Sequence, residues 1–222
     1  MTELLQWLTE LDNQILLTVN GWHSPFFDYF MKAYSGKVVW VPMYAAILYV
    51  IVRNFHWRTS LFCMIAVALT ITFADQMGAT VIRPLVERLR PANPDNPISE
   101  MVHIVDGYRG GRYGFPSCHA ANTFGLAFFI LFLFRKRWLS CYMMIWAALT
   151  SYSRMYLGVH YLGDLLAGML LGALGAWLMY QLFVRVSRYE RPSLVSRLYL
   201  PVHVGILTML SMAIYAALRL IL

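Results

Sequence analysis

Apolar residues along this chain gather in six long runs that are separated by short polar links. The runs lie near residues 37–53, 59–82, 117–134, 138–157, 161–184 and 202–221. Each run approaches the roughly 20 residues that a helix needs to cross about 30 Å of hydrocarbon. The pattern therefore predicts an all-α fold, a bundle of six transmembrane helices.

The first 31 residues have a different pattern. Apolar side chains recur there at helical spacing, at Leu4, Leu8, Leu11, Ile15 and Val19. Glu10 and Asp12 stand outside that stripe, which indicates an amphipathic helix. We expect residues 1–31 to form a helix that lies in the membrane interface. The alternative is an ordinary helix packed over the bundle. The start of the chain lacks a basic n-region, so no cleavable signal peptide is predicted.

Composition agrees with a membrane protein. Of the 222 residues, 59% are hydrophobic and 13% are charged, whereas soluble domains carry about 25% charged residues. We expect one domain over residues 1–222. The net charge of +7 does not indicate nucleic-acid binding, because the basic residues are scattered between apolar runs and form no stripe.

The distribution of basic residues predicts an orientation. Nine arginines and lysines lie in the links at 53–58, 135–137 and 185–200, and the positive-inside rule places these links in the cytoplasm. Both termini and the links at 83–116 and 155–160 then lie on the outer face. The 91–116 loop is long enough to be functional, and we expect it to cover a site there; disorder is the alternative.

Two polar clusters lie at this outer face. Arg83 and Arg90 are seven residues apart, and helical spacing would place them on one face. The sequence Pro116-Ser117-Cys118-His119 opens the third apolar run. Arginine side chains and the backbone N–H groups at a helix N-terminus both bind phosphate oxygens.

The third cluster lies between the fourth and fifth apolar runs, and it contains Arg154, His160 and Asp164. If the chain around His160 is helical, Asp164 lies one turn away on the same face. A carboxylate can then hold one imidazole nitrogen while the other nitrogen attacks. Polar groups of this kind inside membrane sequence are functional candidates.

The three clusters together predict phosphoryl transfer without a metal. They supply arginines, a hydroxyl group, two histidines that can divide the work, and one carboxylate. The sequence has no acidic cluster suited to magnesium and no His/Cys grouping at zinc spacing.

The motifs Arg83-x6-Arg90-Pro91, Pro116-Ser117-Cys118-His119 and Ser153-Arg154-x5-His160-x3-Asp164 carry a resemblance. From about residue 70 to 180 the chain resembles the type 2 phosphatidic acid phosphatase superfamily, in its bacterial membrane branch. That superfamily includes the lipid phosphate phosphatases and the vanadium haloperoxidases. Two positions depart from it: Arg83 stands for the usual lysine and Cys118 for the usual glycine.

The resemblance implies a role for each matched residue. His160 would attack phosphorus and become a phosphohistidine, and Asp164 would orient it. His119 would protonate the leaving oxygen and then activate water. The residues implied to hold the phosphoryl oxygens are Arg83, Arg90, Ser117, Arg154 and the amide of Cys118. No cofactor or metal is implied.

The implied protein is a multi-pass lipid phosphatase of the bacterial inner membrane, with its site on the periplasmic face. Candidate substrates are undecaprenyl diphosphate, a lipid A phosphate and glycerophospholipid phosphates. A lipid-to-lipid phosphotransferase and a non-catalytic polyprenyl-phosphate-binding protein are alternatives. Gly168 and Gly172 continue the Asp164 face and are expected at a helix–helix contact.

Overall fold

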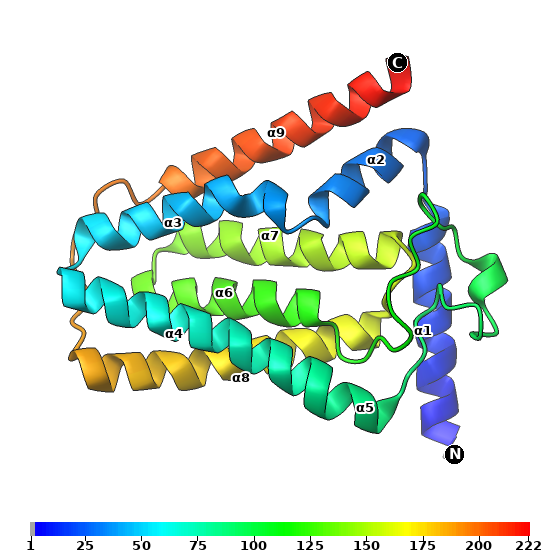
Figure 1. The fold of residues 1–222 in the computed structure, drawn as a ribbon, viewed down its shortest axis with the longest axis horizontal. Helices are drawn as coiled ribbons and strands as arrows, with labels where there is room; N and C mark the ends of the chain where they lie inside the picture. Colours follow the sequence, from blue (N-terminus) through cyan, green and yellow to red (C-terminus); the bar gives the residue numbers. More distant parts are fainter. Residues whose placement is uncertain (1–2) are drawn as a thin grey trace.

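The protein is all-helical in the computed structural model, which describes residues 3–222 (Figure 1). The helices are α1 (Glu3–Gly21), α2 (Pro25–Tyr34), η1 (Val38–Trp40), α3 (Val41–Asn54), α4 (Trp57–Gln76), η2 (Met77–Ile82), α5 (Arg83–Val86), η3 (Ser99–Met101), α6 (Cys118–Phe134), α7 (Arg137–Tyr156), α8 (Leu162–Ser187) and α9 (Leu200–Ile221). No strand occurs in these residues, and a single antiparallel bridge joins Leu89 and Tyr113.

A helix occupies each of the six apolar runs. Three helical stretches are long and apolar enough to cross a membrane: Trp57–Val86, Leu162–Ser187 and Leu200–Ile221. A fourth candidate is the pair Pro25–Tyr34 and Val38–Asn54, which is bent by 69°. The helix of the third run is shorter, with 17 residues. Membrane-crossing helices are therefore present, whereas a count of six remains a prediction.

The long helices run side by side, and α1 crosses one end of them (Figure 1). Helix α6 is central, because it packs against α4, α7 and α8. The contact between α6 and α8 is made through glycines. A Cβ atom added at Gly168 would lie 2.4 Å from the carbonyl oxygen of Ser117, and one at Gly172 would lie 2.3 Å from that of Ala121. The prediction that both glycines pack against another helix is confirmed.

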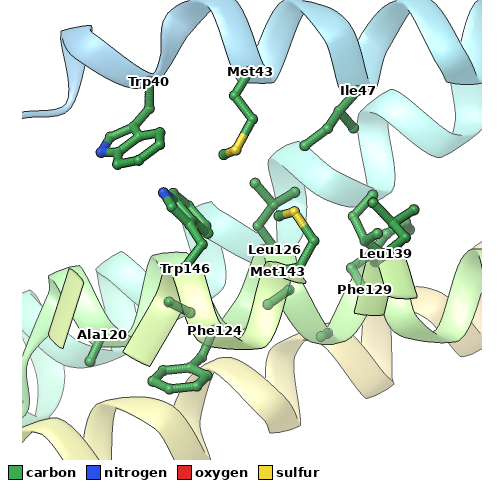
Figure 2. Close-up of a cluster of buried hydrophobic side chains, with 14 of the residues drawn as sticks. Trp40, Met43, Ile47, Ala120, Phe124, Leu126, Phe129, Leu139, Met143 and Trp146 are labelled. Carbon is green, nitrogen blue, oxygen red and sulfur yellow. The ribbon is translucent and has the colours of Figure 1, made fainter. Parts of the chain in front are cut away.

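Large apolar side chains fill the space between α3, α6 and α7 (Figure 2). Trp40 and Trp146 meet edge to face with their ring centroids 5.6 Å apart, a favourable geometry for aromatic pairs. Met43 and Met143 continue this contact and are fully buried. These contacts pack η1 and α3 against α7.

The N-terminal segment is two helices, so the prediction of one helix over residues 1–31 is wrong. Helix α1 ends at Gly21, and α2 begins at Pro25 after the N-cap Ser24. Proline in the first turn and a serine N-cap both favour a new helix start. Asn20 is buried at the end of α1 and donates to the carbonyl oxygen of Tyr156 at 2.7 Å. Helix α1 is thus attached to the bundle; residues 1 and 2 lie outside the described part.

Candidate active site

His160 lies at the centre of the polar clusters, in the turn between α7 and α8, and is 1% exposed. Its Nδ1 is 3.2 Å from Oδ2 of Asp164, which also accepts from the backbone N–H of Tyr161 at 3.1 Å. His160 itself precedes helix α8, so the expected helical stacking is wrong. The contact forms because Asp164, in the first turn of α8, reaches back to the residues before the helix, as capping side chains do.

Arg90 contacts the other side of the same imidazole. Its Nη1 is 2.8 Å from Nε2 of His160 and donates to the carbonyl oxygen of Val159 at 3.0 Å. A guanidinium group has donors only, so Nε2 must accept and Nδ1 must carry the proton that is donated to Asp164. The ring is therefore held in one tautomer, with the Nε2 lone pair facing the arginine.

The chain that carries Arg90 is extended, which contradicts the prediction that Arg83 and Arg90 share a helix face. Helix α5 ends at Val86 because Glu87 is left-handed, with φ of 48°. The following segment then pairs with the later part of the loop: Arg90 N–H donates to the carbonyl oxygen of Arg112 at 3.1 Å. Arg83 instead faces the start of α6.

The start of α6 contacts Arg83 of the first polar cluster and Asp164 of the third. Arg83 Nη2 donates to the carbonyl oxygen of Pro116 at 3.0 Å and lies 3.1 Å from Sγ of Cys118. Ser117 is fully buried and is the N-cap of α6, where its Oγ accepts from Ala120 N–H at 3.4 Å. Its own N–H donates to the carbonyl oxygen of Asp164 at 2.9 Å. The first turns of α6 and α8 are therefore held together.

Arg154 lies in the last turn of α7 and is 3% exposed. Its guanidinium group donates to Oγ of Ser35 and, at 3.1 Å, to the hydroxyl of Tyr108. Tyr108 belongs to the 91–116 loop, so this loop contacts Arg154. The loop also brings Gly114 against the imidazole, because a Cβ added there would lie 3.0 Å from Oδ2 of Asp164 and 3.4 Å from Nδ1 of His160.

The electrostatics of the site favour a neutral imidazole and an incoming anion. Burial, together with the charges of Arg90, Arg154 and Arg83, holds the pKa of His160 well below its usual range. Burial and repulsion from Arg154 and Arg83 lower the pKa of Arg90 to about 10. That arginine is still protonated at neutral pH, so three guanidinium groups add positive potential around a neutral histidine.

His119 lies in the first turn of α6 and lines a cavity of about 500 Å³ between α3, α4, α6 and α7. Within residues 3–222 no hydrogen bond joins its ring to His160 or to an arginine. The structure thus places His160, Asp164 and Arg90 in direct contact. Of the other predicted residues, Ser117 reaches Asp164 through its backbone, and Arg83 contacts Cys118.

The sequence interpretation missed Arg88. Its Nη1 is 3.1 Å from Oδ1 of Asp164, and its Nη2 is 2.8 Å from Oδ2 of Asp12 in α1. In an extended segment, residues two apart point to the same side. Reading residues 87–90 as extended would therefore have placed Arg88 beside Arg90.

Across the described residues, no group of three or more His, Cys, Asp or Glu side chains is arranged to hold a metal ion.

Comparisons with known proteins give consistent matches. The model of the PAP2 superfamily matches residues 57–188. A lipid A 4'-phosphatase of Bacteroides thetaiotaomicron is 60% identical over 177 residues, which cover 80% of this chain and 79% of that protein. A lipid A 4'-phosphatase of Porphyromonas gingivalis is 33% identical over 181 residues, covering 81% of this chain and 76% of that protein.

The fold also resembles a solved structure, the crystal structure of the first transmembrane PAP2 type phosphatidylglycerolphosphate phosphatase from Bacillus subtilis. The TM-score is 0.60 at 21% identity, and the match covers 85% of this chain and 90% of that chain. At this identity the likeness concerns the fold alone.

Proposed function

The chain belongs to the PAP2 superfamily, and from this premise we propose that it removes the 4'-phosphate from lipid A by way of a phosphohistidine at His160. That it is a multi-pass membrane protein and a lipid phosphate hydrolase follows from its helices and its relatives. The substrate is proposed because the relative at 60% identity is named for that reaction. Undecaprenyl diphosphate and glycerophospholipid phosphates are the competing substrates.

One observation supports the mechanism above all others: His160 is held between Asp164 and Arg90 in a single tautomer. Asp164 accepts the Nδ1 proton at 3.2 Å, so the Nε2 lone pair is the one available for attack. The guanidinium group 2.8 Å from Nε2 is close enough to donate to the oxygens of a phosphoryl group that is attacked there. A nucleophile oriented by a carboxylate, next to a donor for developing charge, is the arrangement that covalent catalysis requires.

In the first step, the Nε2 lone pair of His160 forms a bond to phosphorus while the bond from phosphorus to the lipid oxygen breaks. The leaving oxygen takes a proton from His119. The imidazole then carries the phosphoryl group on Nε2 and its proton on Nδ1, where Asp164 stabilises the positive ring. Arg90 exchanges its hydrogen bond to Nε2 for one to a phosphoryl oxygen.

In the second step, water attacks phosphorus and gives a proton to His119. The bond between phosphorus and Nε2 breaks, its electron pair returns to His160, and inorganic phosphate leaves. Both steps place negative charge on the same oxygens. Their proposed donors are the guanidinium groups of Arg83, Arg90 and Arg154, together with the hydroxyl of Ser117 and the backbone N–H of Cys118 at the start of α6.

The proposed setting is the bacterial inner membrane, crossed six times, with this site at the periplasmic face. The basic links at 53–58, 135–137 and 185–200 support that orientation. They join α3 to α4, α6 to α7 and α8 to α9. Figure 1 shows all three at the end of the bundle opposite α1 and the 91–116 loop. A charge asymmetry and a polar site thus lie at opposite ends of the same helices.

The test is a panel of lipid phosphates assayed with the protein in detergent. We expect phosphate release from lipid A to exceed that from undecaprenyl diphosphate, phosphatidic acid and phosphatidylglycerol phosphate. His160→Gln should lose roughly 10³-fold or more of the activity. His119→Gln should lose about 10²- to 10⁴-fold. The control is His203→Gln, since His203 is exposed at the start of α9.

The intermediate needs a separate measurement. With ³²P-labelled substrate and an alkaline quench, the wild type should carry label on the protein, and His160→Gln should carry none. Label on the protein without release of phosphate, followed by transfer to an added lipid, would indicate a phosphotransferase. Full turnover by His160→Gln would overturn the mechanism.

A further inference from the structure

His119, one of the predicted site residues, lines the cavity of about 500 Å³ between α3, α4, α6 and α7. His119, Asn122 and Thr123 line it from α6, and its other walls are almost entirely apolar. Ile47 of α3 and Val67 of α4 are examples. A volume of this size is typical of small-molecule sites and is far larger than a phosphate group needs. The cavity therefore has room for the apolar part of a molecule whose polar part lies near His119.

The position of His119 indicates which part of a substrate the cavity would hold. This step rests on the proposed function. A general acid must lie within hydrogen-bond reach of the oxygen that it protonates. That oxygen belongs to the lipid, not to the transferred phosphate. The lipid must consequently extend from phosphorus toward His119, and the cavity is the apolar space that begins at this side chain.

Lys37 is the basic residue at the same end of the cavity. It precedes η1, outside residues 57–188 that match the family. Among residues 3–222 it forms no ion pair with a carboxylate. Although burial raises the pKa of Tyr108, the positive charges of Arg154, Arg90 and Lys37 lower it overall. Lys37 is thus close enough to Tyr108 of the 91–116 loop for its charge to act on that side chain.

We propose that this cavity binds an acyl chain of the lipid substrate and that Lys37 binds the polar headgroup at the point where the chain begins. The site would then select a lipid phosphate in two ways, by the apolar length that the cavity buries and by headgroup oxygens that accept from an ammonium group. Lys37 is a specificity-determining residue in this arrangement. The phosphoryl group itself is held by the three arginines of the proposed mechanism, none of which lines the cavity.

The cavity is tested by filling it. Ala68 of α4 lines the cavity, and Ala68→Phe places a ring where the chain would lie. The measurement is kcat/KM for a lipid phosphate with long acyl chains and for p-nitrophenyl phosphate, which has none. We expect the ratio of the two values to fall roughly tenfold or more, because only the long substrate loses buried methylenes. Ala68→Leu should give a smaller fall.

Ala217→Phe is the matched control, since Ala217 is exposed on α9 and does not line the cavity. Its ratio should equal that of the wild type. Hydrolysis of p-nitrophenyl phosphate shows that each variant is folded and that the catalytic site works. If the wild type hydrolyses neither substrate, the proposed function fails. If it hydrolyses both and Ala68→Phe leaves the ratio unchanged, bilayer lipid fills the cavity and the inference is overturned.

Lys37 is tested by Lys37→Gln, with Lys37→Arg as the conservative variant. For the lipid substrate, we expect Lys37→Gln to raise KM roughly tenfold with a smaller effect on kcat, because a headgroup contact is lost. Lys37→Arg should retain most of the affinity. Lys32→Gln removes a charge from the same part of the chain, where Lys32 pairs with Asp106. An equal effect of Lys37→Gln and Lys32→Gln would show general attraction and refute a headgroup contact.

Discussion

Arg88 joins the carboxylate of Asp164 to that of Asp12, with its two terminal nitrogens 3.1 Å and 2.8 Å from the respective oxygens. The other oxygen of Asp12 accepts from the N–H of Gly163 at 3.0 Å. Asp12 belongs to α1, outside the residues that match the family. The N-terminal helix is therefore connected, through one arginine, to the group that orients His160.

Replacing Arg88 with methionine should lower kcat about 10- to 100-fold, the usual cost of losing a residue that orients a functional ligand. Asp164 is fully buried and would keep its contact with His160 but lose its contact with Arg88. The effect on KM should be smaller, since Arg88 contacts carboxylates and not the site of the phosphate. Steady-state kinetics at several pH values measure both.

Arg112→Met is the control for Arg88→Met, because Arg112 is exposed in the 91–116 loop and its Nη2 lies 3.6 Å from Oδ2 of Asp95. Asp12→Asn tests the outer part of the chain of contacts and should reduce kcat less than Arg88→Met does. An Arg88→Met enzyme with unchanged kcat and an unchanged pH profile would show that the contact with Asp164 has no catalytic role.

The stability of the protein should fall as the pH falls below about 6.5, the usual pKa of histidine. The pKa of His160 is well below that value in the folded protein, because of burial and the neighbouring Arg90, Arg154 and Arg83. At pH 5 to 6 the unfolded chain therefore binds a proton that the folded chain does not, which favours unfolding. The slope approaches about 1.4 kcal/mol per pH unit for one such group.

Thermal unfolding in detergent from pH 7.5 to 5 measures this linkage. His160→Gln should give a flatter dependence than the wild type, since the variant has no group to titrate there. His203→Gln, at an exposed position, should leave the slope unchanged. Parallel curves for the wild type and His160→Gln would contradict the assignment of a neutral, buried imidazole.

A bulky maleimide on Cys118 should inhibit the enzyme roughly tenfold or more, because small displacements near reacting groups are costly. Its Sγ is 3.1 Å from Nη2 of Arg83, and the residue is only partly buried, whereas Cys63 is buried. Cys118→Ala should resist the reagent and remain active. Labelling of Cys141, which is exposed, should have no effect. Equal inhibition of Cys118→Ala would place the sensitive thiol elsewhere.

The positions of the long helices could be predicted because apolar runs of about 20 residues have few other uses. The break after Gly21 was missed, although Ser24 and Pro25 are standard signals for a helix start. The apolar periodicity of residues 1–31 predicts one continuous helix, and these two local signals contradict it. The end of α5 had no such signal, since Glu87 adopts a left-handed conformation that its residue type does not favour.

The contact between His160 and Asp164 was predictable because the two residues are four apart, and they meet at 3.2 Å. They meet because Asp164 caps the start of α8, not because the two residues stack on one helix. The relation of Arg90 to Nε2 of His160 depends on the fold of the 91–116 loop, which brings Arg112 beside Arg90. Asp12 and Arg88 are 76 positions apart, and no local pattern links them. Contacts that depend on the pairing of loop segments, or on a helix that crosses the bundle, can be identified only from the structure.

Gly172→Ala should destabilise the protein by about 1–3 kcal/mol, the usual cost of overpacking. The added Cβ would lie 2.3 Å from the carbonyl oxygen of Ala121 and 2.8 Å from the backbone nitrogen of Gly125. Both are backbone atoms of α6, so relief requires α6 and α8 to separate. The melting temperature in detergent should fall by several degrees. Activity should fall as well, since the same helices hold Ser117 N–H against the carbonyl oxygen of Asp164 at 2.9 Å.

Gly111→Ala is the matched control, because a Cβ at Gly111 meets no atom within 4 Å. A Gly172→Ala protein as stable and active as Gly111→Ala would show that the contact between α6 and α8 tolerates a wider spacing than the structure indicates.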